Sequence, residues 1–298
     1  MKLGYTLPIL FCFVLFAKND LNAQVSKRAY KKEIELWDGK RIDALKAANG
    51  WVNLAGLFWL KEGSNTFGSD STSDIVFSHS EFPKRLGTFV VSSNRVDWIT
   101  SEGNEVMLKD NKIQHITAFD IDSASNPSLS YKSFKWNIIK RENKIGVRFR
   151  DLNSPALQAL THINRYTIDP KWNIKAVFEP SLYSTIAITN VLGQTTQQQS
   201  PGKLRFSINN VSYTLDALDE GTGDFFVIFG DNTNGIETYH TGRFMYVPKP
   251  DQNGITYIDF NKAYNPPCTF TSFATCPIPP KQNILSIDIT AGEKSVHF

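Results

Sequence analysis

A hydrophobic repeat of two residues, which begins at Trp51 and recurs to the C-terminal region, most strongly constrains the fold. Phe134, Trp136 and Ile138 show it clearly, because they alternate with polar residues as one buried face of a strand does. Turn-forming pairs such as Asn209-Asn210 separate the runs. Since no long helices alternate with these runs, the sequence predicts a mainly β fold of antiparallel sandwich or barrel-type sheets, preceded by an N-terminal helix.

Three details of this strand pattern are specific enough to test. Residues 239–247 and 255–260 read as two neighbouring strands joined by a short loop, which predicts a hairpin. Residues 285–289 read as a further strand, and the polar stretch 194–200 reads as a loop.

Residues 1–23 have the layout of a secretory signal peptide. Lys2 supplies a positive start, residues 7–17 form an apolar run, and Leu21-Asn22-Ala23 is a small-residue cleavage site. The apolar run is too short to span a bilayer, so we expect no stable membrane span after cleavage. The expected protein is exported, either periplasmic or secreted. The rival interpretation is an uncleaved N-terminal anchor.

Residues 24–50 have the pattern of a helix. Tyr30, Ile34, Trp37 and Leu45 recur at helical spacing with charged residues between them, and Asn49-Gly50 is a helix stop. We expect this helix to pack on the sheets that follow it.

The C-terminal segment 239–294 gathers unusual residue types, and we call it the hallmark segment. Its motifs are Asp259-Phe260-Asn261, Tyr264-Asn265-Pro266-Pro267, Cys268, Cys276 and Ala291-Gly292-Glu293-Lys294. These motifs resemble the DUF1684 family, which is named only as a domain of unknown function. The resemblance runs over residues 30–294, is strongest in the hallmark segment, and transfers no established activity. It implies a β-rich DUF1684 core over residues 116–298.

Residues 51–115 form the other predicted region, which is sandwich-like. The stretch LKEGSNTFGSDSTSDIVFS loosely resembles the opening of a forkhead-associated (FHA) sandwich. The arginine and Ser-x-x-His with which such domains hold phosphothreonine are absent, so phosphopeptide recognition is not expected.

Polar residues of the hallmark segment form the candidate ligand-binding set. The set is Tyr239, Arg243, Asp259, Asn261, Tyr264, Asn265 and Glu293. In the predicted hairpin Arg243 would lie within reach of a bidentate ion pair with Asp259. As a binding pocket, the set would use Arg243 to hold an anion and Tyr239 or Tyr264 as hydrogen-bond donors. The rival interpretation is a buried polar network that fixes a proline-rich loop on the sheet.

Asp231 is a further acidic candidate, in the turn Asp231 to Gly235. An aspartate at such a position accepts backbone hydrogen bonds and shapes the turn, and the alternative is that it orients a ligand.

The cysteines allow three interpretations. Once a signal peptide is removed, Cys268 and Cys276 remain, and an even count in an exported protein favours a disulfide. Such a bridge would stabilise the protein by about 2–3 kcal/mol. Buried packing thiols are the second interpretation, and a metal or redox function is the third.

Several classes of function are not expected from the sequence. The five histidines show no zinc-hydrolase spacing, no nucleophile elbow is present, and we expect neither a metal nor another cofactor. A formal net charge of +3 argues against a nucleic-acid partner.

The sequence therefore predicts an exported protein that binds a small polar or anionic ligand under the 264–280 loop. Two alternatives stay open. One is a metal-independent hydrolase that uses Asp259 or Glu293 as general acid–base. The other is a structural module of the cell envelope.

Overall fold

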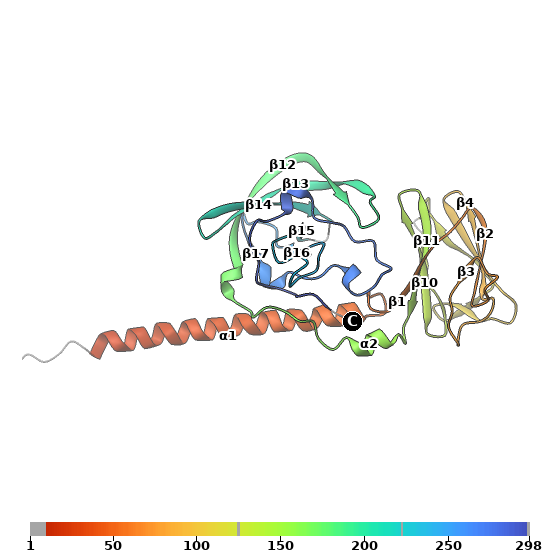
Figure 1. Ribbon diagram of the computed structural model, residues 1–298, viewed down its shortest axis with the longest axis horizontal. Coiled ribbons are helices and arrows are strands. Elements are labelled where there is room, and N and C mark those ends of the chain that lie inside the picture. Colours follow the sequence, from red (N-terminus) through yellow and green to blue (C-terminus); the bar gives the residue numbers. More distant parts are fainter. Residues whose placement is uncertain (1–9, 124–125, 222, 297–298) are drawn as a thin grey trace, which may run out of the picture. The chain divides into compact units, whose positions relative to one another are not determined.

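The computed structural model describes residues 10–123, 126–221 and 223–296, with side chains from Ser26 onward (Figure 1). The first nine residues of the expected signal peptide lie outside the described residues. Two compact units make up the chain. The first, which we call the C-terminal unit, contains Met1–Asp43, His162–Thr269 and Thr275–Phe298, and the second, the sandwich unit, contains Ala44–Thr161 and Phe270–Ala274.

The predicted fold class is confirmed, because the strands form three sheets and almost every strand pair is antiparallel. The exception among the described pairs is β2 with β3, which is parallel. The strands of the sandwich unit are β1 (Leu54–Trp59), β2 (Gly63–Gly68), β3 (Ile75–Val76), β4 (Gly87–Ser92), β5 (Arg95–Thr100), β6 (Val106–Leu108), β7 (Asn111–Ile113), β8 (His115–Asp120), β9 (Leu129–Tyr131), β10 (Phe134–Arg141) and β11 (Lys144–Asp151). Those of the C-terminal unit are β12 (Asn173–Thr189), β13 (Thr195–Ile208), β14 (Val211–Asp219), β15 (Phe225–Phe229), β16 (Arg243–Val247) and β17 (Ile255–Asp259).

Two sheets form the sandwich unit, in the orders β1-β11-β10-β9-β6-β7 and β3-β2-β4-β5-β8. Alternation along the strands places one face of each sheet in a shared core. In β10 the predicted residues Phe134, Trp136 and Ile138 are all buried in this core. Aromatic rings fill much of it, and the rings of Phe67 and Phe149 meet edge to face at 5.4 Å between centroids.

The division between the units differs from the predicted segments. Strands β9 to β11 lie beyond residue 115, yet β11 pairs with β1 and β9 pairs with β6. Residues 116–161 therefore belong to the sandwich unit, where β9, β10 and β11 complete its first sheet. The short helix α2 (Pro155–Ala159) follows this sheet within the same unit.

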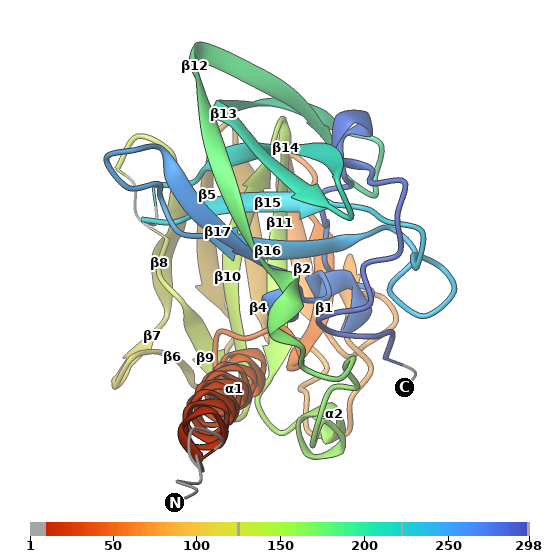
Figure 2. The ribbon, with the colours of Figure 1, turned by 90° about the vertical axis from the view of Figure 1, so that its left-hand side faces the viewer.

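One six-stranded sheet, in the order β16-β15-β14-β13-β12-β17, forms the body of the C-terminal unit. Figure 2 shows β12 and β13 as long strands that curve over β14 to β16. All five residues of β15 are buried, as expected for a short continuous apolar run. The core behind the sheet includes Phe229, Phe260 and Ile289, so the hallmark segment contributes to it directly.

The N-terminal helix α1 spans Leu10–Lys46 and is longer than the predicted helix of residues 24–50. No proline or glycine interrupts the chain between Leu10 and Asp38, so nothing in the sequence breaks the helix between the expected signal segment and the predicted helix. Among the described residues, no helix combines the length and the apolar composition needed to cross a bilayer.

The hairpin predicted from residues 239–247 and 255–260 is wrong. Strands β16 and β17 stand at opposite ends of the hydrogen-bonded order, and β17 pairs with β12 instead. Pro248 and Pro250 lie in the connection and have no N–H to donate to a ladder, which explains why the chain leaves β16 there.

Two further segments differ from prediction. Residues 195–200 belong to β13, because their backbone pairs with the far end of β12 although their side chains are mostly exposed. Residues 285–289 are not a strand: Leu285 and Ile289 are buried like strand residues, but the Ile289 N–H donates to the Asp231 carboxylate.

Candidate functional site

Arg243, the predicted anion anchor, is fully buried at the start of β16. Its guanidinium donates to the Asp231 carboxylate over 2.8 Å and to the Ile289 carbonyl over 2.9 Å, and a further bond reaches the Ala291 carbonyl. The predicted ion pair with Asp259 is wrong, because β16 and β17 do not form a hairpin. Arg243 instead fixes the C-terminal segment to the sheet.

Asp231 completes this buried ion pair. Besides Arg243, its carboxylate accepts the Thr233 N–H over 2.9 Å and the Thr233 hydroxyl over 2.6 Å. The predicted role of Asp231 in shaping its turn is therefore confirmed. The carboxylate is fully buried, so the Arg243–Asp231 pair belongs to the core of the unit.

Glu293 and Asn265 form a second buried cluster with a residue that the sequence did not single out, Arg41 of α1. Arg41 donates through Nε to Glu293 over 3.2 Å and through its terminal nitrogen to the Asn265 carbonyl over 2.9 Å. The other Glu293 oxygen accepts the Asn265 N–H over 2.6 Å. Burial raises the pKa of Glu293, and the positive charge of Arg41 opposes that rise.

Asp259 and Asn261 form a third cluster, again with a residue of α1. The Tyr30 hydroxyl donates to Asp259 over 2.7 Å, and the Asn261 amide donates to the Tyr30 oxygen over 2.9 Å. Asn261 also exchanges hydrogen bonds with the backbone of Asp169, over 2.9 Å and 3.1 Å. Burial and the bond to Asp259 raise the pKa of Tyr30, which keeps this hydroxyl protonated.

A helical stripe explains how α1 reaches all of these residues. Tyr30, Ile34, Trp37 and Arg41 recur at helical spacing, so they share one face of α1. Ile34 is fully buried, and the Arg41 guanidinium lies 4.5 Å from the centre of the Tyr264 ring. The presence of Arg41 in an otherwise apolar stripe was the signal in the sequence for a buried acidic partner.

Tyr264 stands where this stripe meets an open groove of about 290 Å³. The groove is lined by aromatic rings, by three carboxylates and by one lysine, together with Asn173 and Pro248. The rings are Trp37, Tyr246, Tyr257 and Tyr264, and the charged residues are Glu33, Asp224, Asp259 and Lys262. Of the predicted ligand-binding set, Asp259 and Tyr264 line this groove.

The electrostatics of the groove favour positive or hydrogen-bond-donating groups. Its lysine, Lys262, is already paired with Glu33 at 2.7 Å and lies 3.9 Å from Asp259. The Tyr246 hydroxyl donates to Glu220 over 3.1 Å, which brings a further carboxylate to the rim. Burial raises the pKa of Tyr264 well above its ordinary value, so its hydroxyl stays neutral.

Tyr239, the remaining residue of the predicted set, belongs to a different neighbourhood. Its carbonyl accepts from Asn234 and Gly242, and its ring lies 4.5 Å from the His240 ring. These contacts all belong to the connection before β16.

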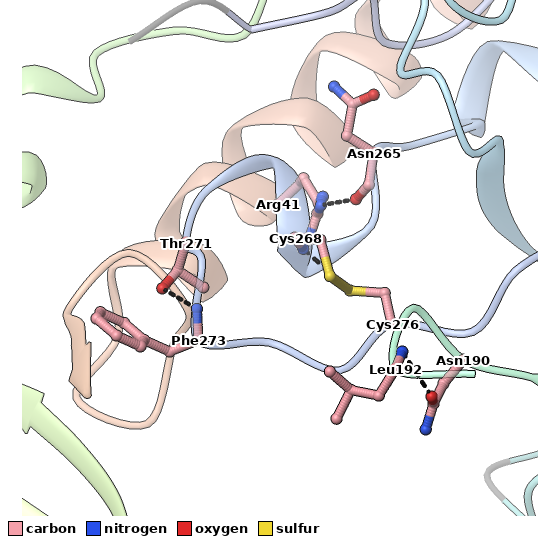
Figure 3. Close-up of a disulfide and its surroundings, with 8 residues drawn as sticks. All are labelled: Arg41, Asn190, Leu192, Asn265, Cys268, Thr271, Phe273 and Cys276. Carbon is pink, nitrogen blue, oxygen red and sulfur yellow. Dashed lines mark hydrogen bonds between the residues drawn. A yellow bond between two sulfur atoms is a disulfide. The ribbon is translucent and has the colours of Figure 1, made fainter. Parts of the chain in front are cut away.

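Cys268 and Cys276 are joined in a disulfide, with 6.1 Å between their Cα atoms (Figure 3). Asn265, whose carbonyl accepts from Arg41, lies just before the bridge. The N–H of Val191, just after the end of β12, donates to the Cys276 carbonyl over 3.0 Å. Among the described residues no group of three or more His, Cys, Asp and Glu side chains could hold a metal ion.

The fold and its polar clusters define a β-rich protein whose N-terminal helix is fastened to its C-terminal sheet by buried hydrogen bonds. Residues 158–294 match the family model DUF1684, described as a protein of unknown function, so the resemblance read from the sequence is confirmed over this region. The match begins at residue 158, whereas the sequence resemblance was expected from residue 30. No curated protein matches the chain.

Two solved structures are similar to parts of the chain. One is the solution NMR structure of an uncharacterized Haloarcula marismortui protein, with 27% identity, 47% of this chain and 80% of that chain covered, and a TM-score of 0.39. The other is the FhaA FHA domain complexed with the intracellular domain of Rv3910, with 12% identity, 32% and 97% covered, and a TM-score of 0.22.

Proposed function

We propose that the protein binds a small polar ligand, rich in hydroxyl or ammonium groups, in the groove beside Tyr264. The observation that carries the proposal is the composition of that groove, where four aromatic rings and three carboxylates face the same space. Aromatic faces accept the apolar side of a sugar-like ligand or a cation, while carboxylates accept hydrogen bonds from its polar groups.

An anionic ligand finds less support. Arg243, the residue proposed to hold an anion, is enclosed in the core with Asp231. Lys262 supplies the positive charge in the groove, but Glu33 already neutralises it. The proposed ligand is therefore neutral or cationic, and it lies at the start of the 264–280 loop.

A hydrolase that uses Glu293 also finds less support. The Glu293 carboxylate is fully buried and bonded to Arg41 and Asn265, away from the groove lining. Asp259 does line the groove, but its partners Tyr30 and Asn261 hold it as a hydrogen-bond acceptor.

Thermal unfolding with a panel of sugars, polyols and amines tests the binding proposal. A ligand at a hundred times its Kd stabilises the folded state by about 2.7 kcal/mol, which raises Tm by several degrees. Tyr257→Ala and Asp224→Asn should remove the shift, since both residues line the groove. Asp288→Asn is the matched control, because Asp288 is exposed in the same unit and lines a different groove.

The proposal fails if no member of the panel raises Tm. It fails equally if a Tm shift survives both groove variants unchanged.

We also propose that the protein is exported and that residues 1–23 are removed. The signal-like layout of these residues and the disulfide both support an oxidising compartment. Tyr30, Trp37 and Arg41 lie beyond the cleavage site, so the mature chain would keep every α1 contact described above. Mass spectrometry of the protein from its native host should find Gln24 at the N-terminus, and an intact Met1 would contradict cleavage.

A further inference from the structure

The sandwich unit contains a second groove, of about 650 Å³, which is distinct in its charge from the groove beside Tyr264. It lies where β6 and β9 meet the start of β10. Its floor is apolar, and its polar lining consists of three lysines and two serines. The lining residues are Leu108, Lys109, Pro127, Ser128, Ser130, Lys132, Lys135 and Leu152.

The three lysines have no acidic partner. Among the described residues, none of the ammonium groups of Lys109, Lys132 and Lys135 forms an ion pair or a hydrogen bond. Other lysines of the same unit do form such contacts: Lys112 pairs with Glu105, and Lys140 donates to Asn94 over 2.8 Å. The Lys132 ammonium lies 5.6 Å from the centre of the Tyr131 ring, and the N–H donors of the three lysines are open to a ligand.

The backbone fixes two of these lysines at the groove. Lys109 lies in the two-residue turn between β6 and β7, and Lys132 lies in the two-residue turn between β9 and β10. Both have a positive φ, 53° and 51°, in the left-handed region that such tight turns require. Because tight turns hold their Cα atoms, the two side chains start from set positions on the rim.

The third lysine stands opposite another positive charge. Lys135 of β10 is the direct cross-strand partner of Arg150 of β11, and cross-strand partners point to the same face of a sheet. Like charges in this position repel each other. Arg150 donates to the Asn137 side chain and the Asn49 carbonyl, neither of which carries a negative charge.

The nearest carboxylates in the sequence do not neutralise this groove. Asp151, opposite the start of β10, accepts from the Ser133 hydroxyl over 3.1 Å and from the Asn153 N–H over 2.9 Å. Asp110 follows Lys109 in its turn but does not line the groove. A bound anion would relieve the repulsion between Lys135 and Arg150 that these carboxylates leave in place.

We propose that this groove binds a small molecule bearing oxyanion groups, held by Lys109, Lys132 and Lys135 and by the hydroxyl of Ser130. Ammonium groups and hydroxyls donate to phosphate, sulfate and carboxylate oxygens alike. The groove volume falls within the range of small-molecule sites, and its apolar floor suits a ligand with a carbon skeleton. This site does not depend on the function proposed for the groove beside Tyr264.

Calorimetry on the full mature chain at constant ionic strength tests the proposal, with inorganic pyrophosphate and citrate as two separate probes. At least one probe should bind saturably with one site per chain. Tighter binding of pyrophosphate would indicate a phosphate-type ligand, and tighter binding of citrate would indicate a carboxylate-type ligand. The triple variant K109Q/K132Q/K135Q should weaken binding about tenfold or more, since each charge-assisted bond contributes substantially. Lys84→Gln is the matched control, because Lys84 is an exposed lysine of the same unit outside the groove.

If the triple variant does not fold, binding to single variants and the NMR shifts of backbone amides on addition of the probe test the proposal instead. Lys132→Gln alone should weaken binding severalfold, and the probe should shift the amide signals of Ser128, Ser130 and Lys132. Saturable binding by neither probe overturns the proposal. Equal weakening by Lys84→Gln and by the groove variants overturns it as well, because it would show binding by overall charge.

Discussion

Nε of Arg41 lies 3.2 Å from Oε1 of Glu293, although 252 positions separate the two residues in the sequence. This contact ties α1 to the tail of the hallmark segment, and the Tyr30–Asp259 bond of 2.7 Å ties it to the middle. The polar residues of the hallmark segment thus act first as a docking surface for the N-terminal helix. The groove beside Tyr264 exists because α1 contributes Glu33 and Trp37 to its wall.

Removal of the Arg41 charge should destabilise the protein strongly. Arg41→Met leaves the Glu293 carboxylate buried without its ion-pair partner, and such a loss costs about 3–5 kcal/mol. Urea unfolding measures the difference. Lys40→Met, on the exposed face of the same helix, should change the free energy of unfolding by less than about 0.5 kcal/mol. Equal effects of the two variants would contradict the role of Arg41.

The pH dependence of stability should report the same ion pair. Because burial raises the pKa of Glu293 above its ordinary value of 4.5, the folded state binds this proton more tightly than the unfolded state does. The contribution of Glu293 to the free energy of unfolding therefore falls as pH rises from that ordinary value through the raised pKa. In Arg41→Met the opposing positive charge is gone, so the fall should be larger and should extend to higher pH.

Urea unfolding of the wild type and of Arg41→Met at pH 5 and pH 8 measures the direction of this pH dependence. The double variant that adds Glu293→Gln is the control, because a glutamine does not titrate and the additional fall should disappear. Greater stability of Arg41→Met at pH 8 than at pH 5 would contradict the account.

The Arg243–Asp231 pair should be more important for stability than an exposed pair on the same sheet. Arg243→Met leaves Asp231 fully buried without its counter-ion and should cost about 3–5 kcal/mol. Arg205 pairs with Glu179 where both side chains are about half exposed, so Arg205→Met should cost less than about 1 kcal/mol. Denaturant unfolding of the two variants makes the comparison. Similar losses in the free energy of unfolding would contradict the role given to the buried Arg243–Asp231 pair.

Reduction of the disulfide should lower stability without abolishing the fold. Cys268 and Cys276 are separated by 8 positions, and a loop of that size corresponds to about 2.5 kcal/mol in the chain-entropy model. The double variant C268S/C276S should be less stable by that amount and should be insensitive to reductant. Two free thiols titrated in the unreduced protein would contradict the bridge.

The fold class could be predicted because it depends on local alternation. In β10 and β15 the pattern of apolar residues fixes which side chains are buried, and the structure follows it. Strand pairing could not be predicted in the same way. The partner of β17 is β12, and four strands separate the two in the sequence, so no local pattern distinguishes that pairing from a hairpin with β16.

Of the candidate site, the sequence predicted the residues of the hallmark segment but not their partners on α1. The hallmark segment drew attention to Asn261, Asn265 and Glu293, all of them buried in polar clusters. Their partners Tyr30 and Arg41 stand on a helix far away in sequence. A single sequence contains no distance information that joins them, so the sequence predicted that the helix packs on the sheets but not which residues it contacts there.

Hydrogen–deuterium exchange tests whether contacts with the hallmark segment hold α1 in place. Most helical stability in proteins comes from tertiary packing, so the amides of α1 should exchange rapidly unless tertiary contacts hold the helix. We expect the backbone amides from Tyr30 to Arg41 to be protected to a degree comparable with β15, and we expect Arg41→Met to lower this protection selectively. Rapid exchange of these amides in the wild type, with β15 protected, would contradict it.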